Sequence, residues 1–249
     1  LTGGKNVENK GSFYVQEVME IAAAGSIANS GKMTVQRALQ LKSTAGTFSN
    51  DGTVLSGGLV DVAAATGIRH AGAVQSASDL KMVVGEGSVD NSGSLIAGGD
   101  LSVAASNNID NRGDMQSAGA MALAAASGSI ASDGSFLTEK TFSATTGTGF
   151  KVSGGLQSSG DVDIRNGTGS FVNEGEFLTL GSLNIDAPGG FANSGDMRTN
   201  DGATVVMAGG KATNTGSFLS NDDLSLTGAA EVTNSGDFKA VGDVTVASS

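Results

Sequence analysis

The segment that decides the fold is Ser88–Ala105, which reads SVDNSGSLIAGGDLSVAA. Around its central Gly93, apolar residues stand four positions before and two, eight and ten positions after. Leu101 and Val103 flank a polar serine, and this period of two indicates a strand with one buried face. The Gly, Ser, Asn and Asp residues in between are typical of turns. The segment therefore predicts three short strands joined by turns, because a helix would need apolar positions three and four residues apart.

The same pattern recurs along the whole chain. Each copy has a glycine in an Asn-x-Gly or closely related triplet, and the steps between these anchor glycines alternate between 20 and 21 residues. The anchors are Gly11, Gly31, Gly52, Gly72, Gly93, Gly113, Gly134, Gly154, Gly175, Gly195, Gly216 and Gly236. All 10 phenylalanines fall in the four apolar columns that the copies share. A fixed period of this length is typical of a solenoid.

Stacking the copies predicts an all-β parallel β-helix of about twelve rungs of 20–21 residues. Strands about 4.8 Å apart would then make a rod roughly 58 Å long. A leucine-rich repeat, the competing solenoid, would need a helical side and a leucine-dominated consensus. We expect residues 1–249 to form a single β-helix repeat segment. Because the chain opens on Leu1 without a basic and apolar leader and ends mid-pattern, we expect it to be a fragment of a longer protein.

The composition argues against several functions. The net charge of −11 and the 4% aromatic content disfavour nucleic-acid binding, which needs basic surfaces and stacking platforms. The sequence holds no apolar stretch long enough for a membrane-spanning helix. With no cysteine and one histidine, His70, disulfides, thiolate metal sites and histidine triads are not expected. We therefore predict no cofactor, no metal and no catalytic residue.

A second pattern repeats every 41 residues, directly after the first apolar column that follows each anchor glycine. Odd-numbered copies carry an apolar residue there, and even-numbered copies carry Thr, Gln, Arg or Lys. Because neighbours in a strand face opposite ways, this column is expected to point outward. It could form a receptor-binding stripe or simply pack locally under a side chain from the next turn. The five candidates for the stripe are Leu55, Ile96, Leu137, Leu178 and Leu219.

Two further features are expected to lie in turns. The asparagine two residues before the anchor glycine is present in nine copies. It is expected to adopt a left-handed turn and to hydrogen-bond its own backbone or the asparagine of the next rung. His70 replaces it once, so we interpret His70 as a substituted turn residue. Arg112, Gly113 and Asp114 spell the tripeptide that integrins bind, although Gly113 is also a repeat anchor.

Ser88–Ala105 resembles the haemagglutinin repeat of large bacterial exoproteins, which include the filamentous haemagglutinins and the contact-dependent inhibition toxins. FANSGDMRT at 191–199 and VTNSGDFKAVGDVTVAS at 232–248 are similar. The resemblance implies a right-handed parallel β-helix that is exported by an outer-membrane transporter of the two-partner type. It also implies a secreted or cell-surface location on a Gram-negative bacterium and attachment to a receptor or glycan on a host or bacterial cell.

Three functions are consistent with this sequence. The first is the shaft of an adhesin, and the second is the stalk or receptor-binding segment of a contact-dependent growth inhibition toxin. The third is a polysaccharide-cleaving β-helix enzyme, for which the available carboxylates are Asp79, Asp100, Asp161, Asp223 and Asp243. An enzyme is disfavoured because the turns vary by no more than one residue and offer no long loops to wall a cleft.

Overall fold

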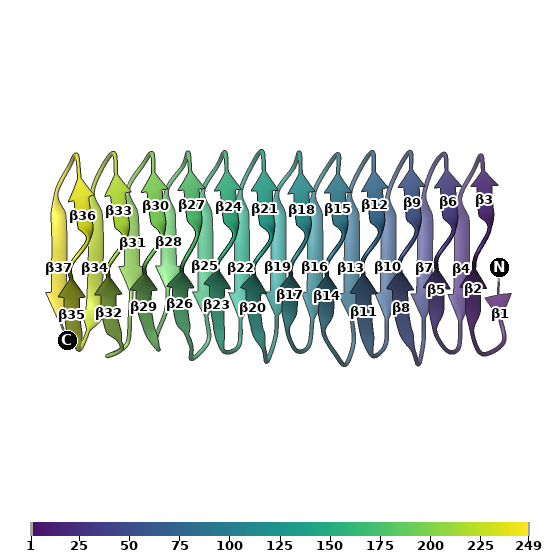
Figure 1. Cartoon of the computed structure of the whole chain (residues 1–249), viewed down its shortest axis with the longest axis horizontal. Coiled ribbons are helices and arrows are strands. Elements are labelled where there is room, and N and C mark those ends of the chain that lie inside the picture. The colour runs from purple at the N-terminus through teal and green to yellow at the C-terminus, as the bar shows by residue number, and fades with distance from the viewer. Residues whose placement is uncertain (1, 249) are drawn as a thin grey trace.

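The computed structural model describes residues 2–248, which form a rod of stacked coils with the two termini at opposite ends (Figure 1). We call each coil a rung and number the rungs 1 to 12 in the order of their anchor glycines, from Gly11 to Gly236. Each rung contributes one strand to each of three parallel sheets. The chain is therefore an all-β solenoid of about twelve turns, as the repeat predicts. No helix occurs among residues 2–248, and so none that could cross a bilayer.

The three sheets, A, B and C, follow one another around each rung. Sheet A consists of β1 (Thr2–Gly3), β4 (Met19–Ala23), β7 (Leu39–Ser43), β10 (Val60–Ala64), β13 (Leu80–Val84), β16 (Leu101–Ala105), β19 (Met121–Ala125), β22 (Phe142–Thr146), β25 (Val162–Asn166), β28 (Leu183–Asp186), β31 (Ala203–Val206), β34 (Leu224–Ala229) and β37 (Val244–Ser248). Sheet B consists of β2 (Val7–Asn9), β5 (Ile27–Asn29), β8 (Thr47–Asn50), β11 (Gly67–His70), β14 (Val89–Asn91), β17 (Ile109–Asn111), β20 (Ser129–Ser132), β23 (Gly149–Val152), β26 (Ser170–Asn173), β29 (Gly190–Asn193), β32 (Lys211–Asn214) and β35 (Glu231–Asn234). Sheet C consists of β3 (Ser12–Val15), β6 (Lys32–Val35), β9 (Thr53–Ser56), β12 (Ala73–Ser76), β15 (Ser94–Ala97), β18 (Asp114–Ser117), β21 (Ser135–Thr138), β24 (Gly155–Ser158), β27 (Glu176–Thr179), β30 (Asp196–Thr199), β33 (Ser217–Ser220) and β36 (Asp237–Ala240).

The strands pair in register from one rung to the next. In sheet A, Val103 pairs with Met82 of the preceding rung and with Leu123 of the following one. Equivalent positions of successive repeats are thus neighbours across the sheet, and like residues stack in columns along the rod. All three paired residues are at most 3% exposed. The apolar columns predicted from the sequence therefore form the interior of the rod.

Phenylalanines dominate the core in the second half of the rod. The rings of Phe150, Phe171 and Phe191 stack on successive rungs, with centroids 6.0 and 5.6 Å apart and planes 4° and 11° apart. Phe177 meets Phe171 edge to face at 5.9 Å. Each of these rings is at most 2% exposed. Burying a side chain of this size contributes about 1.5–3 kcal/mol, which makes the core columns the main source of cohesion.

The anchor glycines stack at the corner between sheets B and C because the backbones approach too closely for a side chain. A Cβ on Gly113 would overlap the carbonyl oxygen of Gly93 one rung below, and the same overlap recurs up the column. That oxygen accepts a hydrogen bond of 2.9 Å from the amide of Asp114. Gly11, in the first rung, has open space where its Cβ would be. Glycine therefore recurs at the anchor position because the backbones of neighbouring rungs are in contact there.

The asparagines form a ladder inside the rod, at the end of each sheet B strand. The Nδ2 amide of Asn9 donates to Oδ1 of Asn29 at 2.7 Å, and Asn29 donates in turn to Asn50 at 2.6 Å. The expected bonds between rungs are thus confirmed for this column. The expected left-handed turn is wrong, because no residue other than glycine has a positive φ among residues 2–248. Each asparagine is instead the last, inward-facing residue of an extended strand.

Candidate binding faces

The predicted stripe lies on the outward face of sheet C. In these strands the second and fourth residues are inside and the third is outside, as the pattern of burial in β21 shows. Leu137 in that strand is 36% exposed, and its equivalents two and four rungs away are partly exposed. The five stripe residues therefore share one face and point outward, as expected. Whether they contact a receptor stays a prediction.

Shallow hollows lie between the apolar residues of this stripe. One of about 190 Å³ is lined by Leu137 and Leu178 with Gln157 between them. A second of about 290 Å³ is lined by Leu178 and Leu219 with Arg198 between them. Between Leu137 and Leu219, apolar residues two rungs apart therefore flank a shallow hollow at the polar rung between them.

The Arg-Gly-Asp tripeptide lies where sheet B turns into sheet C, and neighbouring rungs hold both of its charged side chains. The guanidinium of Arg112 is 2.7 Å from the carboxylate of Asp90 in the rung below. Asp114 accepts a hydrogen bond of 2.5 Å from the hydroxyl of Ser135 in the rung above. Gly113 belongs to the glycine column. Each residue of the tripeptide therefore has a role in the stack, and integrin binding stays a prediction.

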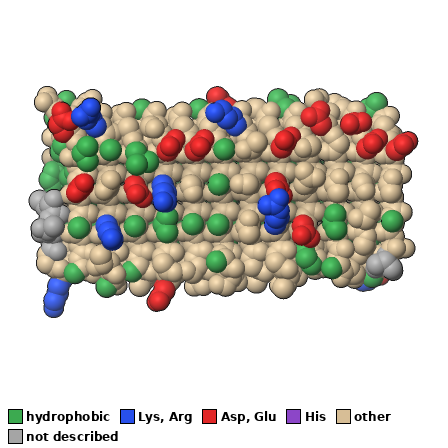
Figure 2. Space-filling view, turned by 180° about the vertical axis from the view of Figure 1, so that it is seen from behind, with side chains coloured by type: hydrophobic (Ala, Val, Ile, Leu, Met, Phe, Trp, Pro, Cys, Tyr) green, Lys and Arg blue, Asp and Glu red, His purple; other side chains and the backbone are tan. Residues whose placement is uncertain are grey.

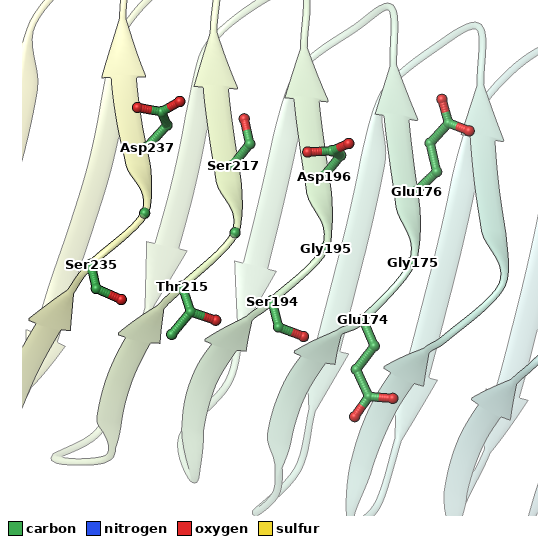
Figure 3. A pocket seen from close by; sticks show the side chains of 12 residues that line it. Glu174, Gly175, Glu176, Ser194, Gly195, Asp196, Thr215, Ser217, Ser235 and Asp237 are labelled. Carbon is green, nitrogen blue, oxygen red and sulfur yellow. The ribbon is translucent and has the colours of Figure 1, made fainter.

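A wider groove runs over the glycine column near the C-terminal end of the rod (Figure 3). It holds about 770 Å³, and its two rims carry acidic and hydroxyl side chains from β26 to β36, including Glu174, Glu176 and Asp196. The ammonium group of Lys151, 2.8 Å from Glu174, lowers the pKa of that carboxyl group, and the hydroxyl of Ser153 lowers it further. The groove follows from the missing side chains of the stacked glycines.

A row of aspartates lies at the corner between sheets C and A, along the upper edge of the molecule in Figure 2. Oδ1 of Asp79 accepts the backbone amide of Asp100 in the next rung at 2.9 Å, and Asp100 does the same for Ala120 at 2.8 Å. Asp161 accepts the amide and the hydroxyl of Ser182, and these bonds lower its pKa. These carboxylates tie one turn to the next and do not converge on a substrate cleft.

His70 is not a turn residue, which corrects the sequence-based interpretation. It is the last residue of strand β11, fully buried within the asparagine ladder. Its Nδ1 is 3.1 Å from Nδ2 of Asn50, and its Nε2 is 3.1 Å from the carbonyl oxygen of Ser94. A carbonyl only accepts, so Nε2 carries the proton and Nδ1 accepts from Asn50. The sequence signal was available, because Ile68 and His70 are two residues apart and so face the same way.

Burial lowers the pKa of His70 below its ordinary value of 6.5, against the opposing effects of the Ser94 carbonyl and the charge of Asp51. Asp51 forms an ion pair with Arg69 on the outer surface. A protonated Nδ1 would need an acceptor in place of the Asn50 amide. Asn50 could offer its oxygen only by flipping, which would break its bond from Asn29.

We therefore expect protonation of His70 to destabilise the rod as the pH falls below 6.5. A group whose pKa is lowered by folding binds its proton more tightly in the unfolded chain. The contribution of neutral His70 to the free energy of unfolding is therefore complete above pH 6.5 and is lost as the pH falls toward the pKa of His70 in the folded chain. Urea unfolding at pH 7.5 and 5.5 measures this loss. His70→Asn, which restores the ladder residue, should remove the pH dependence. Equal dependence in both proteins would contradict the assignment.

No three His, Asp or Glu side chains of residues 2–248 gather closely enough to hold a metal ion. The charged side chains described above are instead paired with neighbours on adjacent rungs or exposed on the flat faces of the rod.

The stacked parallel sheets, the core columns and the inter-rung ladders define the chain as a β-solenoid of tandem repeats. It belongs to the haemagglutinin-repeat family, whose model matches residues 1–83 and 71–137. Comparison with curated proteins and with solved structures gave no match. The repeat and the solenoid fit the shaft of a filamentous-haemagglutinin-type protein.

Proposed function

We propose that this chain is a shaft segment of a secreted adhesin on the surface of a Gram-negative bacterium, giving reach and attachment to host or neighbouring cells. The observation that carries the proposal is the uniform stack. Every strand pairs with its equivalent one rung on, and the corner ladders repeat with the rungs. Membership of the haemagglutinin-repeat family supports the same role. A catalytic activity is not part of this proposal.

The proposed route to the surface is export through an outer-membrane transporter of the two-partner type, with folding outside. The absence of cysteine suits a chain that crosses a pore unfolded, since no disulfide has to form. Repeats that contact only their neighbours can fold progressively as they emerge. The stalk of a contact-dependent growth inhibition toxin would use the same shaft, and the two roles differ in what the complete protein carries at its tip.

A deletion in step with the repeat tests the shaft role in bacteria that carry the gene. Removing residues 94–134 takes out 41 residues, or two rungs, and joins Gly93 to Ser135 at equivalent positions. We expect this variant to reach the surface with a shaft about 10 Å shorter and to keep its attachment to cells. Display is measured with an antibody against the chain, and attachment is measured by counting bound bacteria.

A deletion out of step with the repeat is the control. Removing residues 94–123 places strands of different sheets opposite one another, so folding and display should fail. Equal loss of display in both variants would contradict a modular shaft. Loss of attachment with full display of the 41-residue deletion would also contradict it, and would assign receptor binding to a stretch that contains Ile96 and the Arg-Gly-Asp tripeptide.

A further inference from the structure

We propose that the rod has a built-in joint, the step between rungs 8 and 9, at which local opening of the solenoid begins. The inference goes beyond the shaft role and does not depend on what the shaft attaches to. Two buried polar atoms carry it. They are the only buried side-chain nitrogen or oxygen atoms of residues 2–248 without a hydrogen-bond partner, and both belong to this step.

The first of these atoms is Oδ1 of Asn173, at a gap in the asparagine ladder. Val152 holds the ladder position of rung 8 and pairs in register with Asn173 of rung 9. Valine has no donor to offer, so the oxygen of the fully buried Asn173 side chain receives no hydrogen bond. Nδ2 of Asn173 donates onward to Asn193 in rung 10 at 2.8 Å. The ladder therefore runs on from rung 9 but is disconnected from rung 8.

The two other residues that replace the asparagine keep their polar groups paired. Ser132 accepts from Nδ2 of Asn111 at 3.0 Å and donates to the carbonyl oxygen of Gly134 at 3.2 Å. His70 uses both of its ring nitrogens. Asn91, one rung above His70, accepts the amide of its own anchor glycine at 3.3 Å. The gap in rung 8 is thus the one that leaves a buried ladder atom unpaired.

The second atom is Nδ2 of Asn166, at the end of β25 in rung 8. Oδ1 of this side chain accepts the hydroxyl of Thr146 in rung 7 at 2.8 Å, which leaves Nδ2 on the side of rung 9. The equivalent residue of rung 9 is Ala187, whose methyl group cannot accept a hydrogen bond. A buried donor or acceptor without a partner keeps its full cost of desolvation. The step between rungs 8 and 9 therefore carries this cost twice.

The apolar contacts do not compensate for this difference between neighbouring steps. Phe150 stacks on Phe171 across the step between rungs 8 and 9, with ring centroids 6.0 Å apart. Phe171 stacks on Phe191 in the same way across the next step, at 5.6 Å. The two steps thus share the same aromatic column in sheet B and differ in their buried polar pairing. That pairing decides which of the two opens first.

The side-chain bonds that cross this step at the corner between sheets B and C lie on the surface. The ammonium group of Lys151 is 2.8 Å from the carboxylate of Glu174, and the hydroxyl of Ser153 donates to the same carboxylate at 3.0 Å. Both partners of the ion pair are nearly half exposed, and exposed pairs add little stability. Because each rung contacts only its neighbours, the corner can open here while the rungs on either side stay folded.

Amide hydrogen exchange of the whole chain, followed residue by residue by NMR, tests the joint. The amide of Glu174 donates across the step to the carbonyl oxygen of Val152 at 2.7 Å, and the amide of Ser194 donates across the next step to Asn173 at 2.8 Å. We expect the protection factor of Glu174 to be at least about tenfold lower. A uniform stack that frays from its ends would show the opposite order, because Ser194 lies nearer the C-terminal end. Protection of Glu174 equal to or above that of Ser194 would overturn the proposal.

Val152→Asn should close the joint by giving Oδ1 of Asn173 a donor, and the protection factor of Glu174 should rise about tenfold. Val172→Asn is the matched control, since Val172 lies on the outward face of β26 beside the same step. It should leave the protection of Glu174 unchanged. No rise with Val152→Asn, or an equal rise with both changes, would contradict the role of the ladder gap.

Asn193→Val is the reverse experiment, because it copies the gap two rungs further on. Oδ1 of Asn214 would lose the donor that now lies 2.8 Å away. The amide of Thr215, which donates to the carbonyl oxygen of residue 193 at 2.8 Å, should then exchange about tenfold faster. Unchanged protection of Thr215 would show that an interrupted ladder does not loosen a step, and the proposal would fail.

Discussion

Val103→Asp is expected to destabilise the rod by about 4 kcal/mol or more, because it places an unpaired carboxylate in the core. Val103 is 1% exposed, between Met82 and Leu123 of the neighbouring rungs. Each rung contacts only its neighbours, so the damage should open the stack locally. Urea unfolding measures the loss of stability, and amide hydrogen exchange locates it at β13, β16 and β19.

Ser102→Asp is the matched control on the same strand. Ser102 faces outward and is paired across sheet A with Lys81 and Ala122. A carboxylate there stays hydrated beside a lysine, and the change in stability should be within about 0.5 kcal/mol. If Val103→Asp and Ser102→Asp melted at the same temperature, the assignment of inward and outward positions would be wrong.

Gly113→Ala is the second change with a large expected effect. Its Cβ would overlap the carbonyl oxygen of Gly93, which is backbone and already bonded to the amide of Asp114. The rungs would have to separate at this corner, at an expected cost of about 3 kcal/mol. The melting temperature of the purified variant measures this effect.

Gly11→Ala provides the internal comparison, since the same repeat position has open space in the first rung. There the added methyl group removes only conformational freedom of the unfolded chain, so stability should be unchanged or rise by about 0.4–1 kcal/mol. Destabilisation at Gly113 alone is the result expected if the glycine recurs because the rungs stack. Equal destabilisation at Gly11 and Gly113 would mean that the glycine serves a local turn instead.

The sequence predicted most of the architecture because the repeat and the period of two are both geometric. Residues spaced by the repeat become neighbours across a sheet, and residues two apart share a face, so Leu101 and Val103 could be placed in the core and Leu137 on the surface. The same rule applied to Val89 and Asn91 would have placed the asparagine ladder inside. Treating Asn-x-Gly as an isolated turn gave the wrong conformation instead.

The contacts of the corners could not be predicted from spacing alone. From the sequence alone, an aspartate just before a strand can be either a solvent-exposed turn residue or a carboxylate that lines a substrate cleft. The structure shows that Asp79 and Asp100 bond the backbone of the next rung because the turns stack at hydrogen-bond distance. The pairing of Arg112 with Asp90 likewise depends on side-chain conformations that a repeat does not determine.

Spin-label distances test the central claim, that successive repeats are successive rungs of one rod. Labels placed at pairs of outward sheet A positions (Asp61 with Ser143, and Asp61 with Ser225) span four and eight rungs. With strands about 4.8 Å apart, pulsed electron resonance should give separations of roughly 19 and 38 Å, doubling as the number of rungs doubles. Separations that do not grow in proportion to the number of repeats would contradict the stacked solenoid.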